Sequence, residues 1–101
     1  MSEAEKREAL RLLRGSVMRS LQRLLTSETQ ATATYLFRVC RPESKTVLLE
    51  ALAYLVAGDY VAETVSRIDQ GDDEPLTSYR LTAKGMQLAE RVLSDPSVLM
   101  D

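Results

Sequence analysis

Side chains that carry out catalysis or bind metals are scarce in this sequence. Histidine is absent and Cys40 is the single cysteine, so the commonest general base and a cysteine-rich metal site are both missing. Cys40 lies in an apolar helix pattern, which favours a packed thiol over a reactive one. Asp72, Asp73 and Glu74 are adjacent, whereas a calcium loop spaces its ligands over about a dozen residues. Because a glycine-rich phosphate loop is also absent, we expect no enzyme, no cofactor and no metal site.

Positive charge is concentrated in the first half of the chain. The net charge is −2, but residues 1–50 hold nine Lys/Arg and six Asp/Glu, whereas residues 51–101 hold four and nine. This surplus in the first half is a weak bias towards nucleic acid. Arg7, Arg11 and Arg14 share one face of a predicted helix. Two interpretations stay open for that face: solvation by water, or contact with phosphates or an acidic partner.

Length and composition predict one domain over 1–101, with a core at about 8–94 and a tail at 95–101. Apolar residues make up 45% of the chain and charged residues 28%, as in soluble globular proteins. No window approaches the roughly 18 apolar residues of a membrane span, and the charged start MSEAEKREAL lacks the apolar core of a signal peptide. We therefore expect a cytoplasmic protein with no membrane partner.

Two helices are predicted in the first forty residues. The first spans 3–25, and Gly15 inside it either allows close packing or is merely tolerated. Its apolar residues recur at intervals of three and four: Leu10, Leu13, Val17, Leu21 and Leu24. The second helix is predicted over 29–40.

A third helix is predicted over 44–57, with Ser44 as N-cap and Gly58 as stop signal. Its core stripe comprises Val47, Leu48, Ala51, Leu52 and Leu55. The preceding turn contains Pro42, which forbids smooth continuation of the second helix. The second and third helices therefore form a helix-turn-helix candidate.

A strand pair and a last helix follow the third helix. Residues 60–68 are rich in β-branched side chains, 70–75 form a polar turn, and 76–81 form a second short strand. Thr82 is the predicted cap of a helix over about 83–94. The predicted fold class is α+β, with three helices, a two-stranded hairpin and a C-terminal helix.

Two segments resemble the winged helix-turn-helix family. In ALAYLVAGDYV, Leu52, Leu55, Gly58 and Val61 look like the junction between recognition helix and wing, although glycine usually stands where Asp59 is. The segment YRLTAKG, residues 79–85, is similar to the Y-x-L-T-x-x-G ending of the wing. Small bacterial transcriptional regulators of the multiple-antibiotic-resistance, arsenic-repressor and PadR types carry such segments, and small proteins of Mu-like prophages share the layout.

The resemblance implies a protein that binds double-stranded DNA, with helix 44–57 in the major groove. The residues then expected to contact bases or phosphates lie around that helix and on the wing strands: Arg38, Arg41, Ser44, Lys45, Thr46, Tyr54, Arg67 and Arg80. It also implies a homodimer, because one winged helix reads only a short site. The first helix is a candidate dimer contact, and the tail SVLMD either packs on its own domain or contacts a second subunit.

The expected surface departs from the usual DNA-binding pattern. On the outer face of helix 44–57, Lys45 is the only cation, and the wing tip, 72–74, is acidic. An acidic tip is repelled by phosphates. Leu49 and Tyr54 are expected to be exposed on the same face and would suit a protein partner. A protein-interaction or phage-assembly module that does not bind DNA therefore stays open as the alternative.

Overall fold

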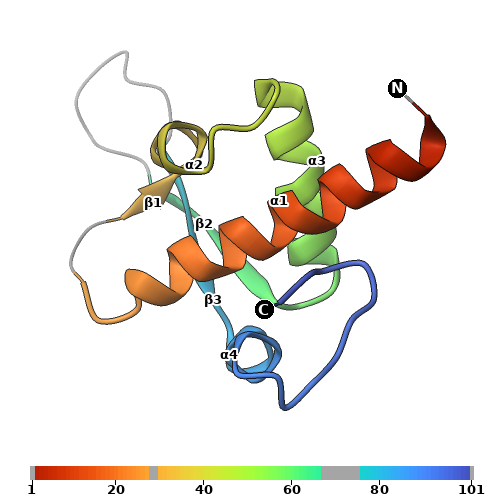
Figure 1. Ribbon diagram of the computed structural model, residues 1–101. Helices are drawn as coiled ribbons and strands as arrows, with labels where there is room; N and C mark the ends of the chain where they lie inside the picture. Colours follow the sequence, from red (N-terminus) through yellow and green to blue (C-terminus); the bar gives the residue numbers. More distant parts are fainter. Residues whose placement is uncertain (1, 28–29, 67–75, 101) are drawn as a thin grey trace.

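Helix α1 (Glu3–Arg23) crosses the molecule, and the other elements pack along it (Figure 1). The computed structural model describes residues 2–27, 30–66 and 76–100. Along the chain, α1 is followed by β1 (Ala31–Thr32), α2 (Ala33–Cys40), α3 (Lys45–Ala57), β2 (Val61–Ser66), β3 (Leu76–Leu81) and α4 (Ala83–Ala89). Helices α2, α3 and α4 and strand β3 all contact α1. The described residues therefore form an α+β fold with four helices and a small antiparallel sheet, which confirms the prediction at this coarse level.

The predicted apolar stripe of α1 forms one wall of the core. Val17 and Leu21 are buried, and the other three members of the stripe are partly buried. The hydroxyl oxygen of Ser2 accepts a hydrogen bond from the Glu5 amide at 3.2 Å and caps the helix. The helix ends at Arg23, earlier than predicted, because the Leu24 amide bonds the Leu21 carbonyl at 3.1 Å in a tighter last turn.

The second helix begins later than predicted. Ala31–Thr32 forms strand β1, and α2 covers Ala33–Cys40. Strand β1 pairs antiparallel with β3, so that Ala31 lies opposite Tyr79. The hydroxyl oxygen of Thr32 accepts a hydrogen bond from the Tyr35 amide at 3.1 Å. Thr32 therefore serves as a strand residue and as the N-cap of α2, both of which suit its β-branched hydroxyl side chain better than a helix interior does.

Helix α3 (Lys45–Ala57) agrees with the prediction from its cap to its last turn. The Ser44 hydroxyl oxygen accepts a hydrogen bond from the Val47 amide at 3.2 Å. Four of the five predicted core residues are buried and Val47 is partly buried. The stop signal differs, because Gly58 has an ordinary φ of −83° and Asp59 takes the left-handed φ of 63°. Aspartate tolerates this region better than most residues do, so it stands where a glycine is usual.

Strand β3 (Leu76–Leu81) is the central strand of the sheet. The order is β1-β3-β2, so the sheet has three strands where two were predicted. Strand β2 (Val61–Ser66) pairs antiparallel with β3, from Val61 opposite Leu81 to Ser66 opposite Leu76. The two predicted strands are thus confirmed over the described range. The predicted turn at 70–75 and the acidic tip at 72–74 lie outside the described residues.

Helix α4 (Ala83–Ala89) is shorter than the predicted 83–94, because Arg91 adopts a left-handed φ of 64°. The Thr82 hydroxyl oxygen accepts a hydrogen bond from the Gly85 amide at 3.0 Å, which confirms the predicted cap. A Cβ atom at Gly85 would lie 2.0 Å from the carbonyl oxygen of Tyr60. Glycine is therefore required where α4 meets Tyr60, the residue before β2.

Residues 95–100, here called the strap, fold back onto α1. Val98 in the strap is only 4% exposed and packs in the core of its own domain, which is one of the two alternatives stated for the tail. A Cβ atom at Gly15 would lie 1.9 Å from the carbonyl oxygen of Leu99. Gly15 is therefore the point at which α1 admits the strap, and it serves close packing.

Candidate nucleic-acid interface

Two arginines of α1, Arg11 and Arg14, bind the strap. The Nε atom of Arg11 donates to the Pro96 carbonyl oxygen at 2.6 Å, and a guanidinium nitrogen of Arg14 donates to the Ser97 carbonyl oxygen at 3.1 Å. The sequence places both arginines on one helix face with Arg7. Arg11 also pairs with Glu8, and Arg7 is exposed, so the two interpretations of that face stay open for Arg7.

Tyr54 is also committed to the strap, so the expectation that it is exposed on the outer face of α3 is wrong. Its hydroxyl donates to Asp95 at 2.9 Å, and the Arg14 guanidinium lies over its ring, 4.1 Å from the centroid. Tyr60 donates to the same carboxylate at 2.9 Å. Burial raises the pKa of Asp95, but hydrogen bonds from the Ser97 amide and from both tyrosines outweigh it and hold that pKa below the ordinary value.

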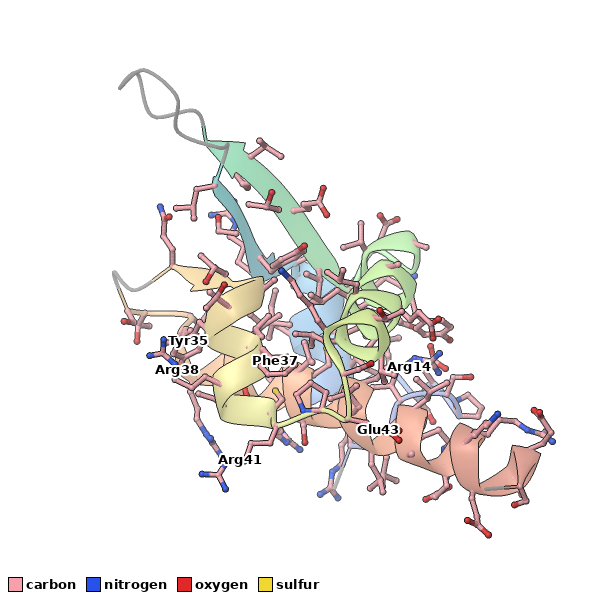
Figure 2. The ribbon with its side chains drawn as sticks, turned by 90° about the horizontal axis from the view of Figure 1, so that it is seen from above. Arg14, Tyr35, Phe37, Arg38, Arg41 and Glu43 are labelled. Atoms are coloured by element: carbon pink, nitrogen blue, oxygen red, sulfur yellow. The ribbon has the colours of Figure 1, made fainter. Side chains whose placement is uncertain are left out.

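Three exposed cations gather where α2 ends and α3 begins, and we call Arg38, Arg41 and Lys45 the cationic edge. Figure 2 shows Arg38 and Arg41 projecting from the end of α2, away from Arg14. None of the three makes an ion pair or a side-chain hydrogen bond with a described residue. The acidic residue beside them is Glu43, which is also exposed. The cationic edge thus has donors available for an anion from outside.

The backbone of Arg41 is left-handed, with φ of 49° and ψ of 55°. Its amide closes α2 by bonding the Phe37 carbonyl at 3.1 Å. A non-glycine residue in this region is uncommon, and the following Pro42 restricts residue 41 further. The signal that marks this position in the sequence is the Arg-Pro pair at the end of an apolar helix.

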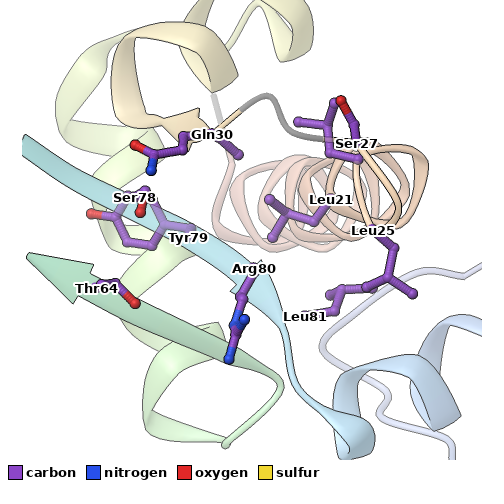
Figure 3. Close-up of a pocket in the computed structure, with 11 residues that line it drawn as sticks. Leu21, Leu25, Ser27, Gln30, Thr64, Ser78, Tyr79, Arg80 and Leu81 are labelled. Carbon is purple, nitrogen blue, oxygen red and sulfur yellow. The ribbon is translucent and has the colours of Figure 1, made fainter.

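The remaining predicted contacts are divided between α3, β3 and residues outside the described ranges. Thr46 is exposed on the first turn of α3, while the Ser44 hydroxyl oxygen is occupied by the cap. Arg80 is exposed on β3 and lines a hollow of about 370 Å³ beside the end of α1 (Figure 3). The described lining of that hollow includes no residue of the cationic edge. Arg67 lies outside the described residues.

The outer face of α3 carries few hydrogen-bonding groups. Lys45, Leu49 and Ala53 are exposed and follow one another at every fourth residue, and Glu50 is exposed beside them. Leu49 is 43% exposed, which is high for a leucine in the middle of a helix. This face therefore presents a cation at its start and apolar groups along its length.

Cys40 is packed, as its helix pattern predicted. Its sulfur lies 3.6 Å from the Ser20 hydroxyl oxygen, and burial raises the pKa of the thiol. Among residues 2–27, 30–66 and 76–100, no three histidine, cysteine or carboxylate side chains group as a metal site would require. No described helix is both long enough and apolar enough to cross a bilayer.

Comparisons with known proteins add no identification to this geometry. No protein-family model, no curated protein and no solved structure matches the chain.

Proposed function

We propose that this protein binds double-stranded DNA as a winged-helix transcriptional regulator, with α3 in the major groove. The observation that carries the proposal is the cationic edge, where Arg38, Arg41 and Lys45 are exposed and lack described ion-pair partners. In helix-turn-helix complexes, the N-terminal residues of the second helix contact base edges, and neighbouring cations bind phosphates. The cationic edge lies at that end of α3.

The order of the elements supports the winged-helix assignment. Helices α2 and α3 are separated by residues 41–44, which is the short turn of a helix-turn-helix. The antiparallel pair β2–β3 follows α3, as a wing would, and α4 follows β3. The close approach of Gly85 to Tyr60 gives the glycine of the YRLTAKG segment a physical reason.

The backbone at Arg41 supports a role for its side chain. An L-residue in the left-handed region costs about 1–2 kcal/mol relative to its ordinary conformations. Glycine adopts this region at no steric cost and is the usual residue just after a helix. Arg91 shares this conformation away from α3, so the strain supports a phosphate contact at Arg41 only together with the position of Arg41 next to the start of α3.

Fluorescence anisotropy with mixed genomic duplex fragments tests the proposal. Each phosphate contact contributes about 0.9 to the slope of log K against log salt, so three contacts weaken binding about 40-fold between 50 and 200 mM salt. Removing one contact by Arg38→Gln or Lys45→Gln lowers that factor to about 12-fold. The matched control is Arg91→Gln, an exposed arginine that follows α4. Absence of binding at 50 mM salt would contradict the proposal. Variants that keep the wild-type salt dependence would contradict the choice of residues.

The proposal includes a homodimer, because two half-sites supply the affinity that one short site lacks. The strap is packed against its own domain, so the first turns of α1 are the remaining candidate contact, and residues 3–9 are exposed there. Light scattering at micromolar concentration tests this state. A monomer at high concentration would remove the dimer from the proposal.

A specific observation favours one alternative, a protein-interaction module. Phe37 and Val39 on α2 are 41% and 45% exposed, and Leu49 on α3 is similarly exposed. Aromatic and aliphatic anchors of this kind carry much of the binding energy at protein interfaces. This alternative predicts salt-insensitive capture of a protein partner that Phe37→Ala abolishes, and no binding of the wild-type protein to DNA fragments.

A further inference from the structure

The exposed apolar residues on the outer face of α3 indicate which part of DNA the helix contacts. We propose that Leu49, together with Ala53, contacts the C5-methyl groups of thymine in the major groove. This inference rests on the proposed DNA-binding function and adds a base preference to it. The partner of this face of α3 is a DNA duplex that presents thymine methyl groups towards the helix.

The groups along α3 exclude extensive reading by hydrogen bonds. Lys45 and Thr46 are the exposed donors on its first turn, and Glu50 is an exposed acceptor one turn later. Leu49 and Ala53, at the centre of the same face, can make only apolar contacts. In the major groove, the apolar group on the floor is the methyl of thymine, and small and apolar side chains contact it.

The cations beside Leu49 and Ala53 fit the same partner. Residues four apart rise about 6 Å along a helix axis, so Leu49 lies roughly 6 Å from Lys45 along α3. The cationic edge therefore adjoins an apolar surface within about two base-pair steps of 3.4 Å each. A duplex offers this combination, because phosphates form the rim of the groove and thymine methyls lie inside it. The anionic rim complements Arg38, Arg41 and Lys45, and the methyls complement Leu49.

Burial of one methyl group sets the expected size of the effect. A buried CH₂ or CH₃ group strengthens binding about fourfold, and two such groups strengthen it about 15-fold. Replacing thymine by deoxyuracil deletes this methyl and keeps the hydrogen-bonding edges of the base. The ratio of dissociation constants for a uracil duplex and its thymine twin should therefore be about 4 to 15.

The experiment uses three fluorescein-labelled 24-bp duplexes: one of mixed A·T sequence with G·C ends, its deoxyuridine twin, and one of G·C pairs alone. Methyls are present in every register of the first duplex, so no operator needs to be known. Anisotropy at about 50 mM salt gives the uracil-to-thymine ratio for the wild type, for Leu49→Ala and for Leu12→Ala. Leu12 is 50% exposed on α1 and is the matched leucine control. Both substitutions are at exposed helix positions where alanine favours the helix, so both variants should fold.

Wild type and Leu12→Ala should share the same ratio, and Leu49→Ala should lower it about fourfold. The G·C duplex should bind more weakly than the thymine duplex. Any effect of uracil on duplex shape persists in Leu49→Ala, so the change in the ratio isolates the contact between the side chain and the methyl. Binding of all duplexes with equal ratios in the wild type and Leu49→Ala would overturn the inference and leave the DNA function standing. A ratio that Leu12→Ala lowers equally would also overturn it, whereas absence of binding to any duplex would overturn the proposed function itself.

Discussion

Replacing Gly15 by alanine should destabilise the protein, although the residue lies inside a helix. Alanine is favoured over glycine by about 1 kcal/mol in a helix interior, so local propensity alone predicts a gain of that size. The structure predicts the opposite sign. The new Cβ atom would lie 1.9 Å from the Leu99 carbonyl oxygen and 3.0 Å from the carbonyl carbon, and these are backbone atoms of the strap.

The cost of the substitution is the stabilisation that is lost when the strap is displaced from α1. Two hydrogen bonds cross at this point, from the Leu99 amide to the Arg11 carbonyl at 3.1 Å and from Arg14 to Ser97 at 3.1 Å. Each contributes about 1 kcal/mol, and full burial of Val98 contributes about 1.5–3 kcal/mol. If about half to all of this is lost, and about 1 kcal/mol is regained from propensity, the net loss is about 1–4 kcal/mol. A loss of 2 kcal/mol lowers the Tm by about 8–16 °C in a domain of this size.

Urea unfolding followed by circular dichroism measures this loss, and a truncation gives its control. A chain that ends at Pro96 lacks the Leu99 carbonyl, so Gly15→Ala should stabilise the truncated protein by about 1 kcal/mol. The substitution should thus change sign between the two backgrounds. Stabilisation of the full chain by Gly15→Ala, or an equal loss in both backgrounds, would refute the assignment of Gly15 to the strap contact.

Two further predictions concern groups at the two ends of α3. Asp95→Asn should cost about 1–3 kcal/mol at pH 7, because the carboxylate accepts hydrogen bonds from Tyr54 and Tyr60. The pKa of Asp95 is lower in the folded protein than its ordinary value of 3.8. The carboxylate therefore contributes fully to the free energy of unfolding above pH 3.8, and this contribution is lost as the pH falls through the folded pKa. Chemical unfolding between pH 7 and 2 should show the wild type converging on the variant in acid, and a constant difference would contradict this. Arg41→Gly should raise the free energy of unfolding by up to about 1 kcal/mol, because glycine removes the Cβ strain at φ of 49° but adds chain entropy, and it should weaken DNA binding. A lower free energy of unfolding in Arg41→Gly would contradict the expected relief of strain. Unchanged DNA binding would contradict the expected phosphate contact.

Local signals were sufficient to predict most helices and strands. Ser44 and Thr82 are hydroxyl residues placed just before apolar periodic segments, and both are N-caps in the structure. Strand β1 had no such signal, because two residues carry no periodicity, and its identity depends on pairing with β3 far along the chain. The early end of α4 was not predicted either, because an arginine such as Arg91 does not indicate a left-handed helix end as a glycine does.

The candidate site was predictable only in part, because the sequence does not reveal which arginines are committed to the fold. Arg11 and Arg38 are the same residue type in predicted helices, yet Arg11 donates to a main-chain oxygen at Pro96 and Arg38 has no described partner. Every residue has a main-chain carbonyl oxygen, so the sequence contains no particular side chain that would indicate a hydrogen bond from an arginine to the main chain. Charge counts over half-chains therefore overstate the cations available to a partner. The structure removes Arg11 and Arg14 from the basic surplus of the first half, and the cationic edge is the exposed group that adjoins the start of α3. Substitution of Arg38 or Lys45 there should weaken the proposed DNA binding without loss of stability.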